Sequence, residues 1–202
     1  PCQHAVDQLL KESISGDVCL SGDVLYDSFL HHKSNAEIPK REGPFALATI
    51  HRAENTDDPE RLKSILSALK NCPVPVVIPM HPRTQNALSK AGVTPDGAIE
   101  CIDPLSYCSM LGYLTHCTFV ITDSGGLQKE AYFSGKRCLI TRDETEWVEL
   151  VECGSSQLAG SFSSGWEDAF EWALKPLEEL ENFYGKGNAG KLIIEKISKL
   201  II

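Results

Sequence analysis

Short runs of apolar residues alternate along the chain with longer segments in which apolar residues recur every three or four positions. Six runs are nearly continuous in apolar residues and are bounded by Gly, Pro or Asp, which predicts strands. These runs are residues 18–21, 45–50, 76–80, 98–102, 118–122 and 138–141. Continuous apolar character is typical of strands that are buried on both faces of a parallel sheet.

The segments between these runs have the periodicity of helices. The clearest is 59–69, whose apolar residues form one stripe, with an Asp before it as N-cap and Pro59 in its first turn. The other predicted helices are 4–14, 84–90, 105–115, 127–134, 166–174 and 189–201. The alternation predicts an α/β fold, a doubly wound domain with one parallel sheet, and we expect residues 1–202 to form that single domain.

Composition and charge argue against two classes of partner, nucleic acid and membrane. The 202 residues are 42% hydrophobic and carry a net charge of -9, which argues against binding nucleic acid through its phosphates. The longest apolar stretch, residues 73–80, is far short of the ~20 residues that span a bilayer, so no membrane partner is expected. No basic segment followed by an apolar one opens the chain, so no signal peptide is predicted and a cytoplasmic location is expected.

The eight cysteines include no C-x-x-C pair and no Cys/His cluster with zinc spacing, so we expect no metal site. Cys19, Cys101, Cys117 and Cys138 lie in or beside apolar runs. They are interpreted as small buried hydrophobic residues in a reducing compartment, with a disulfide framework as the weaker alternative.

Polar residues follow four of the predicted strands. In open α/β sheets ligands bind at the carboxyl ends of the strands, so these residues are the candidates for a site. Their sequences are His-Arg-Ala-Glu-Asn at 51–55, His-Pro-Arg at 81–83, Asp-Ser-Gly-Gly-Leu-Gln-Lys-Glu at 123–130 and Thr-Arg-Asp-Glu-Thr-Glu-Trp at 141–147.

The turn Ser124-Gly125-Gly126 joins a buried strand to a helix N-terminus. Free N–H groups and the helix dipole suit a phosphate there, and Ser124 can donate its hydroxyl. Glu130 lies further along the same helix, where a carboxylate can accept hydrogen bonds from a cis-diol such as ribose. The alternative is a glycine turn that only reverses the chain.

Two histidines also stand at strand ends. His51 is a possible general base, phosphate ligand or residue at the edge of the core, and His81 has the same alternatives or caps a rigid turn with the proline that follows. Arg52, Arg83 and Arg142 could supply positive charge to a pyrophosphate, although each could also be an ordinary surface residue.

Together these motifs resemble the C-terminal half of the non-hydrolysing UDP-N-acetylglucosamine 2-epimerases over about residues 15 to 190. Two glycine turns, at 21–24 and 184–187, add to the resemblance. It implies one Rossmann-like half of a two-domain enzyme of the GT-B type, an arrangement shared with a large class of glycosyltransferases. The N-terminal half, which carries the acid and base carboxylates in this family, is absent from the chain.

The resemblance also implies roles for the motif residues. Ser124, Gly125 and Gly126 would hold the diphosphate and Glu130 the ribose hydroxyls. Near the sugar, the family has an essential catalytic residue that matches His51 and a substrate-site position that matches Arg142. In some bacterial members an activator UDP-sugar is contacted by residues that match Arg52 and His81.

The reaction implied is inversion at C2 of a UDP-2-acetamido sugar for the synthesis of surface polysaccharide precursors. UDP leaves by anti elimination, a glycal intermediate forms, and UDP adds back without any cofactor or metal. The family is usually dimeric through its N-terminal half, so a homodimer is implied for the full-length protein and a monomer for this piece.

The sequence departs from the family pattern at a few positions. Trp147 replaces the Arg of the usual Thr-Glu-Arg-Pro-Glu, which resembles the subgroup acting on UDP-2,3-diacetamido-glucuronic acid. Leu105 and Met110 replace residues usual near the uracil. The alternatives are therefore that second UDP-sugar, a GT-B glycosyltransferase, or a nucleotide-sugar-binding module without turnover.

Overall fold

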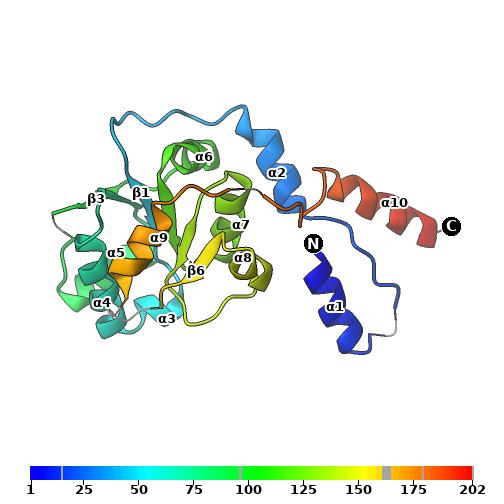
Figure 1. Ribbon diagram of the computed structural model, residues 1–202, viewed down its shortest axis with the longest axis horizontal. Coiled ribbons are helices and arrows are strands. Elements are labelled where there is room, and N and C mark those ends of the chain that lie inside the picture. The colour runs from blue at the N-terminus through cyan, green and yellow to red at the C-terminus, as the bar shows by residue number, and fades with distance from the viewer. Residues whose placement is uncertain (15, 96, 161–164, 179, 202) are drawn as a thin grey trace. The chain divides into compact units, whose positions relative to one another are not determined.

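The chain is divided into two compact units in the computed structural model, which describes residues 1–14, 16–95, 97–160, 165–178 and 180–201 (Figure 1). The larger unit is Ala36–Glu178, and the smaller one combines Pro1–Asn35 with Glu179–Ile202. Every predicted site residue lies in the larger unit. The expectation of a single domain for residues 1–202 stays a prediction.

The larger unit is built on one six-stranded sheet in which every neighbouring pair is parallel. The strand order is β3-β2-β1-β4-β5-β6, which is the order of Rossmann folds. The strands are β1 Ala46–Thr49, β2 Val76–Pro79, β3 Ile99–Ile102, β4 Phe119–Thr122, β5 Cys138–Ile140 and β6 Ser156–Leu158. The predicted parallel sheet is confirmed.

Helices pack on both faces of this sheet. Ala46, Ala48 and Ile121 belong to one core cluster with buried residues of α4, α5 and α9, whereas the alternate residue Leu47 is buried outside that cluster. The helices are α3 Ala53–Thr56, α4 Pro59–Lys70, α5 Pro82–Ala91, α6 Tyr107–His116, α7 Gly125–Phe133, α8 Val148–Glu152 and α9 Trp166–Ala173. None of the helices in the described part of the chain is long and apolar enough to cross a membrane.

The predicted strands differ from those of the structure in two places. Residues 18–21 form no strand, and Leu20 there is 52% exposed, because this short apolar run has no neighbouring strand to pair with. Strand β6 was not predicted, since Ser156–Leu158 contains a single apolar residue. Its edge position explains that composition, because an edge strand needs less apolar cover than the buried strands β1 and β4.

The smaller unit contains α1 Gln3–Lys11, α2 Val24–Lys33 and α10 Ala189–Ile201. Its two glycine turns meet, because the N–H of Asp23 donates to the Tyr184 carbonyl at 3.0 Å. Gly22 has a φ of +79° and a Cβ there would lie 2.9 Å from that carbonyl, so only glycine fits. The Asp27 carboxylate accepts from the N–H groups of Ala189 and Gly190, which caps α10.

The cysteines divide into two groups. Cys117 and Cys138 are buried as predicted, and burial raises the pKa of Cys117 to about 12, which makes it an unreactive thiol. The prediction was wrong for Cys19 and Cys101, which are exposed, because neither lies on a strand that is covered on both faces.

Candidate functional site

A cavity of about 280 Å³ lies at the carboxyl ends of the central strands. Strands β1 and β4 are neighbours at the point where the strand order reverses, which is the usual ligand position in this topology. The residues that line the cavity come from the ends of β1 and β2, from the segments that follow the strands, and from α6 and α7: Thr49, Ile50, His51, Pro79, His81, Pro104, Leu105, Met110, Ser124, Gly126, Leu127 and Glu130. The structure thus brings together the predicted residues His51, His81, Ser124, Gly126 and Glu130.

Ser124 is the N-cap of α7, and its position is fixed from both sides. Its N–H donates to Thr122 Oγ1 at 2.9 Å, and its Oγ lies 3.5 Å from the N–H of Leu127. The first N–H groups of a helix have no partner within the helix and lie at the positive end of its dipole. The Ser124 hydroxyl and these groups can therefore bind an anion at the cavity.

The two glycines after Ser124 have different surroundings. A Cβ at Gly125 would collide with Glu146 Oε1 and lie 3.2 Å from Trp147 Nε1, which donates to the Gly125 carbonyl at 2.9 Å. Gly126 is exposed, and a Cβ there would meet only Ser124 Oγ at 3.9 Å. A side chain at Gly125 would thus force the Glu146 carboxylate and the Trp147 indole to move, whereas Gly126 leaves the backbone open to a ligand.

Asp123 is a site residue for which sequence reasoning assigned no role. It is fully buried, and its carboxylate accepts from the N–H groups of His51 and Arg52 and from Nδ2 of Asn55, at 2.9 to 3.1 Å. It therefore holds the turn after β1 against the end of β4. A carboxylate directly after a buried strand was the signal in the sequence that could have identified it.

The two histidines form one wall of the cavity. The ring centroids of His51 and His81 are 5.6 Å apart, and Nδ1 of His51 lies 3.9 Å from Asp123 Oδ1. His81 caps α5, because its Nδ1 accepts from the N–H of Arg83 at 3.2 Å. An accepting Nδ1 assigns the proton of the neutral ring to Nε2.

Glu130 of α7 also lines the cavity and can present a carboxylate to it. It is only 8% exposed, and its Oε1 accepts from the Tyr107 hydroxyl at 2.8 Å. Burial raises the pKa of Glu130, and the Tyr107 hydroxyl and the nearby Lys129 ammonium oppose that rise. Tyr107 was not predicted to take part in the site.

The arginines are held by carboxylates. Arg142 donates from Nε to Glu54 at 2.8 Å and from Nη1 to Glu146 at 2.7 Å, and Arg52 Nη2 lies 3.8 Å from Glu146. Neither arginine is among the residues that line the cavity. Arg83 likewise pairs with Asp57 at 2.8 Å. The sequence offered these arginines as the source of positive charge at the cavity. In the structure they are paired with carboxylates, so the N-terminus of α7 is the main source of positive charge there.

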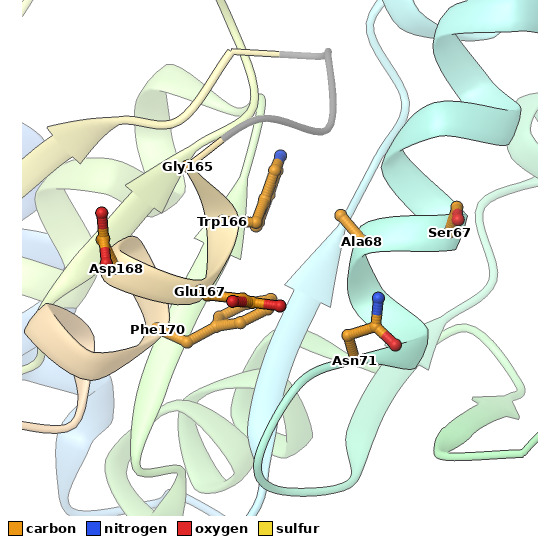
Figure 2. Close-up of a pocket in the computed structure, with 8 residues that line it drawn as sticks. All are labelled: Ser67, Ala68, Asn71, Gly165, Trp166, Glu167, Asp168 and Phe170. Atoms are coloured by element: carbon orange, nitrogen blue, oxygen red, sulfur yellow. The ribbon is translucent and has the colours of Figure 1, made fainter.

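A second cavity, of about 320 Å³, lies between the C-terminal part of α4 and the start of α9 (Figure 2). Figure 2 shows the Glu167 carboxylate between the two helices, on the side of α4 where Asn71 lies. Glu167 and Asp168 give this cavity negative charge, which disfavours a diphosphate. None of the predicted site residues lines it.

A third cavity, of about 710 Å³, adjoins His81. It is lined by Thr56, Asp57, Pro59, His81, Arg83, Asn86, Ala87 and Lys90. Because His81 lines this cavity and the first one, the two share a wall.

Comparison with known proteins assigns the chain to a family. The family model described as UDP-N-acetylglucosamine 2-epimerase matches residues 1–198. The chain belongs to this family. The resemblance inferred from the sequence motifs is therefore confirmed.

Relatives in this family are longer than the chain. The chain is 40% identical over 210 residues to the UDP-2,3-diacetamido-2,3-dideoxy-D-glucuronate 2-epimerase of Pseudomonas aeruginosa. This match covers 99% of the chain and 59% of that protein. It is 33% identical to a UDP-N-acetylglucosamine 2-epimerase of Methanococcus maripaludis, covering 96% of this chain and 58% of the relative. The chain thus spans less than two thirds of these UDP-sugar 2-epimerases.

Solved structures of epimerases share the fold. The Methanocaldococcus jannaschii UDP-GlcNAc 2-epimerase in complex with UDP-GlcNAc and UDP matches with a TM-score of 0.91 and 28% identity, over 98% of this chain and 60% of that one. The Neisseria meningitidis epimerase bound to UDP-GlcNAc matches with a TM-score of 0.82 and 29% identity, over 98% of this chain and 60% of that one. These matches confirm the predicted Rossmann-like fold as one part of a GT-B-type epimerase.

Proposed function

We propose that the chain binds a UDP-sugar in the cavity at the carboxyl ends of β1 and β4 and forms the UDP-binding part of a UDP-sugar 2-epimerase. The observation that carries this proposal is a single cavity in which a capped helix N-terminus and a buried carboxylate face the same space. A nucleoside diphosphate needs both features, one for its phosphates and one for its ribose.

The spacing along α7 fits such a ligand. Glu130 lies six residues after Ser124, which corresponds to about 9 Å along a helix axis. A diphosphate at Ser124 and Gly126 leaves room for the ribose to reach Glu130. Leu105, Met110 and Leu127 give the cavity apolar walls suited to the flat faces of a base.

For the complete protein we propose inversion at C2 of the sugar. A base removes the C2 proton, the bond from C1 to the UDP oxygen breaks in an anti elimination, and a glycal forms. Protonation of C2 on the opposite face and return of UDP to C1 complete the reaction. The helix end, Ser124 and His51 stabilise the charge on departing UDP, with Arg142 near the site. The acid and base carboxylates lie in a part of the protein that this chain does not contain.

Solvent exchange at C2 tests the proposed reaction. We expect the full-length protein, incubated in deuterium oxide with a UDP-sugar alone, to place deuterium at C2, as followed by NMR. A GT-B glycosyltransferase needs an acceptor and would leave C2 unlabelled, which would contradict the proposal. Equal turnover by the isolated 202 residues would contradict the location of the acid and base groups.

The sugar is either UDP-N-acetylglucosamine or UDP-2,3-diacetamido-glucuronic acid. Trp147 and the 40% identity to the Pseudomonas aeruginosa enzyme favour the second. The indole of Trp147 is hydrogen-bonded to the Gly125 carbonyl, so it lies against the start of α7. The exchange experiment with both UDP-sugars, in parallel, decides between them.

Replacing Ser124 with alanine tests the phosphate contact. We expect Ser124→Ala to weaken UDP binding by about 1–3 kcal/mol, because the hydroxyl is a hydrogen-bond donor to a charged group. Calorimetry on this chain measures the change, with Ser89→Ala on the exposed surface of α5 as control. Unchanged affinity in Ser124→Ala would rule out this role for the hydroxyl.

Family membership supports further proposals for the complete protein. We propose a homodimer in the cytoplasm that supplies surface polysaccharide precursors, with an activator UDP-sugar contacted by Arg52 and His81. The cavity of about 710 Å³ beside His81 supports this last proposal, because it offers space for a second ligand next to the first.

A further inference from the structure

We infer that Tyr107 is a positioning residue for nucleotide binding: its hydroxyl holds the Glu130 carboxylate in the orientation that receives a ribose diol. The inference rests on the proposed UDP site and adds to it a residue from another helix. Tyr107 itself need not touch the ligand, because it acts through Glu130.

The hydrogen bond from the Tyr107 hydroxyl to Glu130 joins two different helices, α6 and α7, and no motif in the sequence pairs these two residues. Tyr107 is the first residue of α6, and Glu130 lies in the middle of α7. Tyr107 is 36% exposed, yet its hydroxyl reaches the carboxylate of Glu130, a residue that is only 8% exposed. A polar tip on a large apolar side chain suits this placement between solvent and a buried acid.

The first turn of α6 is itself held in place. Ser106 caps the helix by accepting from the N–H of Ser109 at 3.1 Å, and the Ser109 hydroxyl donates to Glu37 at 2.6 Å. The backbone carrying Tyr107 is therefore fixed by side chains from outside the helix. A fixed donor can set the direction of the carboxylate that it binds.

A carboxylate has capacity for Tyr107 and a diol at the same time. Each carboxylate oxygen offers about two acceptor sites, and Tyr107 uses one of those on Oε1. The two hydroxyls of a diol need one site on each oxygen. The terminal torsion of a Glu side chain is broad, so without an anchor the carboxylate plane rotates and one of these bonds is lost.

The same hydrogen bond favours the ionised carboxylate. Burial raises the pKa of Glu130, and the Tyr107 hydroxyl acts against it, together with Lys129 on α7. His51 and His81 line the same cavity from the turn after β1 and the start of α5. A protonated carboxyl has less acceptor capacity, so the ribose contact is present above the pKa of Glu130 and is lost as the pH falls through it. Removing the hydroxyl moves that loss to higher pH.

The experiment compares UDP with 2′-deoxy-UDP on the same protein samples. Calorimetry gives the ratio of their affinities across a pH series that runs from neutral into acid. Both nucleotides carry the same diphosphate and differ only at the 2′ position, so proton-binding steps that they share cancel in the ratio. The ratio is also unaffected by any fall in the folded fraction, and it reports the 2′-hydroxyl contact alone.

We expect wild type to prefer UDP, and Glu130→Gln to lose most of that preference at every pH. Tyr107→Phe should lower the preference by about threefold to tenfold, the effect of one hydrogen bond, and its fall with acid should begin at higher pH. Tyr113→Phe, a matched loss of a hydroxyl on the same helix with its ring against Phe45, should behave as wild type.

Failure of this inference differs from failure of the proposed site. If Tyr107→Phe keeps the ratio and pH profile of wild type while Glu130→Gln loses the preference, Tyr107 has no positioning role and the UDP site stands. If wild type binds neither nucleotide, or Glu130→Gln keeps the full preference, the ribose assignment of Glu130 fails, and the inference with it.

Discussion

Replacing Asp123 with alanine should destabilise the chain by about 3 kcal/mol or more and abolish UDP binding. The carboxylate is fully buried and accepts from two backbone N–H groups and from Asn55 Nδ2. Each buried donor left without a partner costs about 1–3 kcal/mol, so the loss exceeds that of an ordinary surface substitution. The turn that carries His51 then loses the side-chain hydrogen bonds that join it to the end of β4.

Denaturant unfolding and calorimetry with UDP measure the two effects. Glu60→Ala is the control, because the Glu60 side chain is 78% exposed and pairs at the surface with Lys63, away from Asp123 and Asn55. An exposed pair of this kind is worth about 0–1 kcal/mol. Stability and UDP affinity equal to wild type in Asp123→Ala would show that the turn after β1 is held by other contacts.

Alanine at the adjacent glycines Gly125 and Gly126 should weaken UDP binding in both cases but lower stability only at Gly125. Gly125→Ala should lower both stability and UDP affinity, because the new methyl group collides with Glu146 and crowds the Trp147 indole. Gly126→Ala should leave stability within about 0.5 kcal/mol, since its methyl group meets only Ser124 Oγ at 3.9 Å. Its UDP affinity should nevertheless fall at least about tenfold, or about 1.4 kcal/mol, because the methyl group occupies the space in which a diphosphate approaches the backbone.

Thermal unfolding separates the packing effect from the ligand effect. Each variant serves as the control for the other, since both add one methyl group at neighbouring positions of the same turn. Wild-type UDP affinity in Gly126→Ala would mean that no ligand approaches the backbone there. Wild-type stability in Gly125→Ala would mean that Glu146 and Trp147 move aside without loss.

Much of the fold could be predicted because its signals are local. Four buried strands are continuous apolar runs in the sequence, and α4 and α7 begin directly after residues of the types that cap helices. Two errors have opposite signs. The exposed apolar run at residues 18–21 was predicted as a strand and is none, whereas the polar edge strand β6 was not predicted. In both cases apolar content failed as a guide because the segment is not buried on two faces.

The sequence by itself determined the alternation of strands and helices, the glycine turn from Ser124 to Gly126 at a helix N-terminus and the position of Glu130 on the same helix. These features depend on residues within a few positions of each other. Only the tertiary structure decided what pairs across the sheet. Asp123 meets His51 over 72 residues, Arg142 is held by Glu54 over 88, and Tyr107 reaches Glu130 over 23. The physical reason is that such partners are set by strand order and helix packing, which bring distant residues within hydrogen-bonding distance and leave no periodic trace in the sequence.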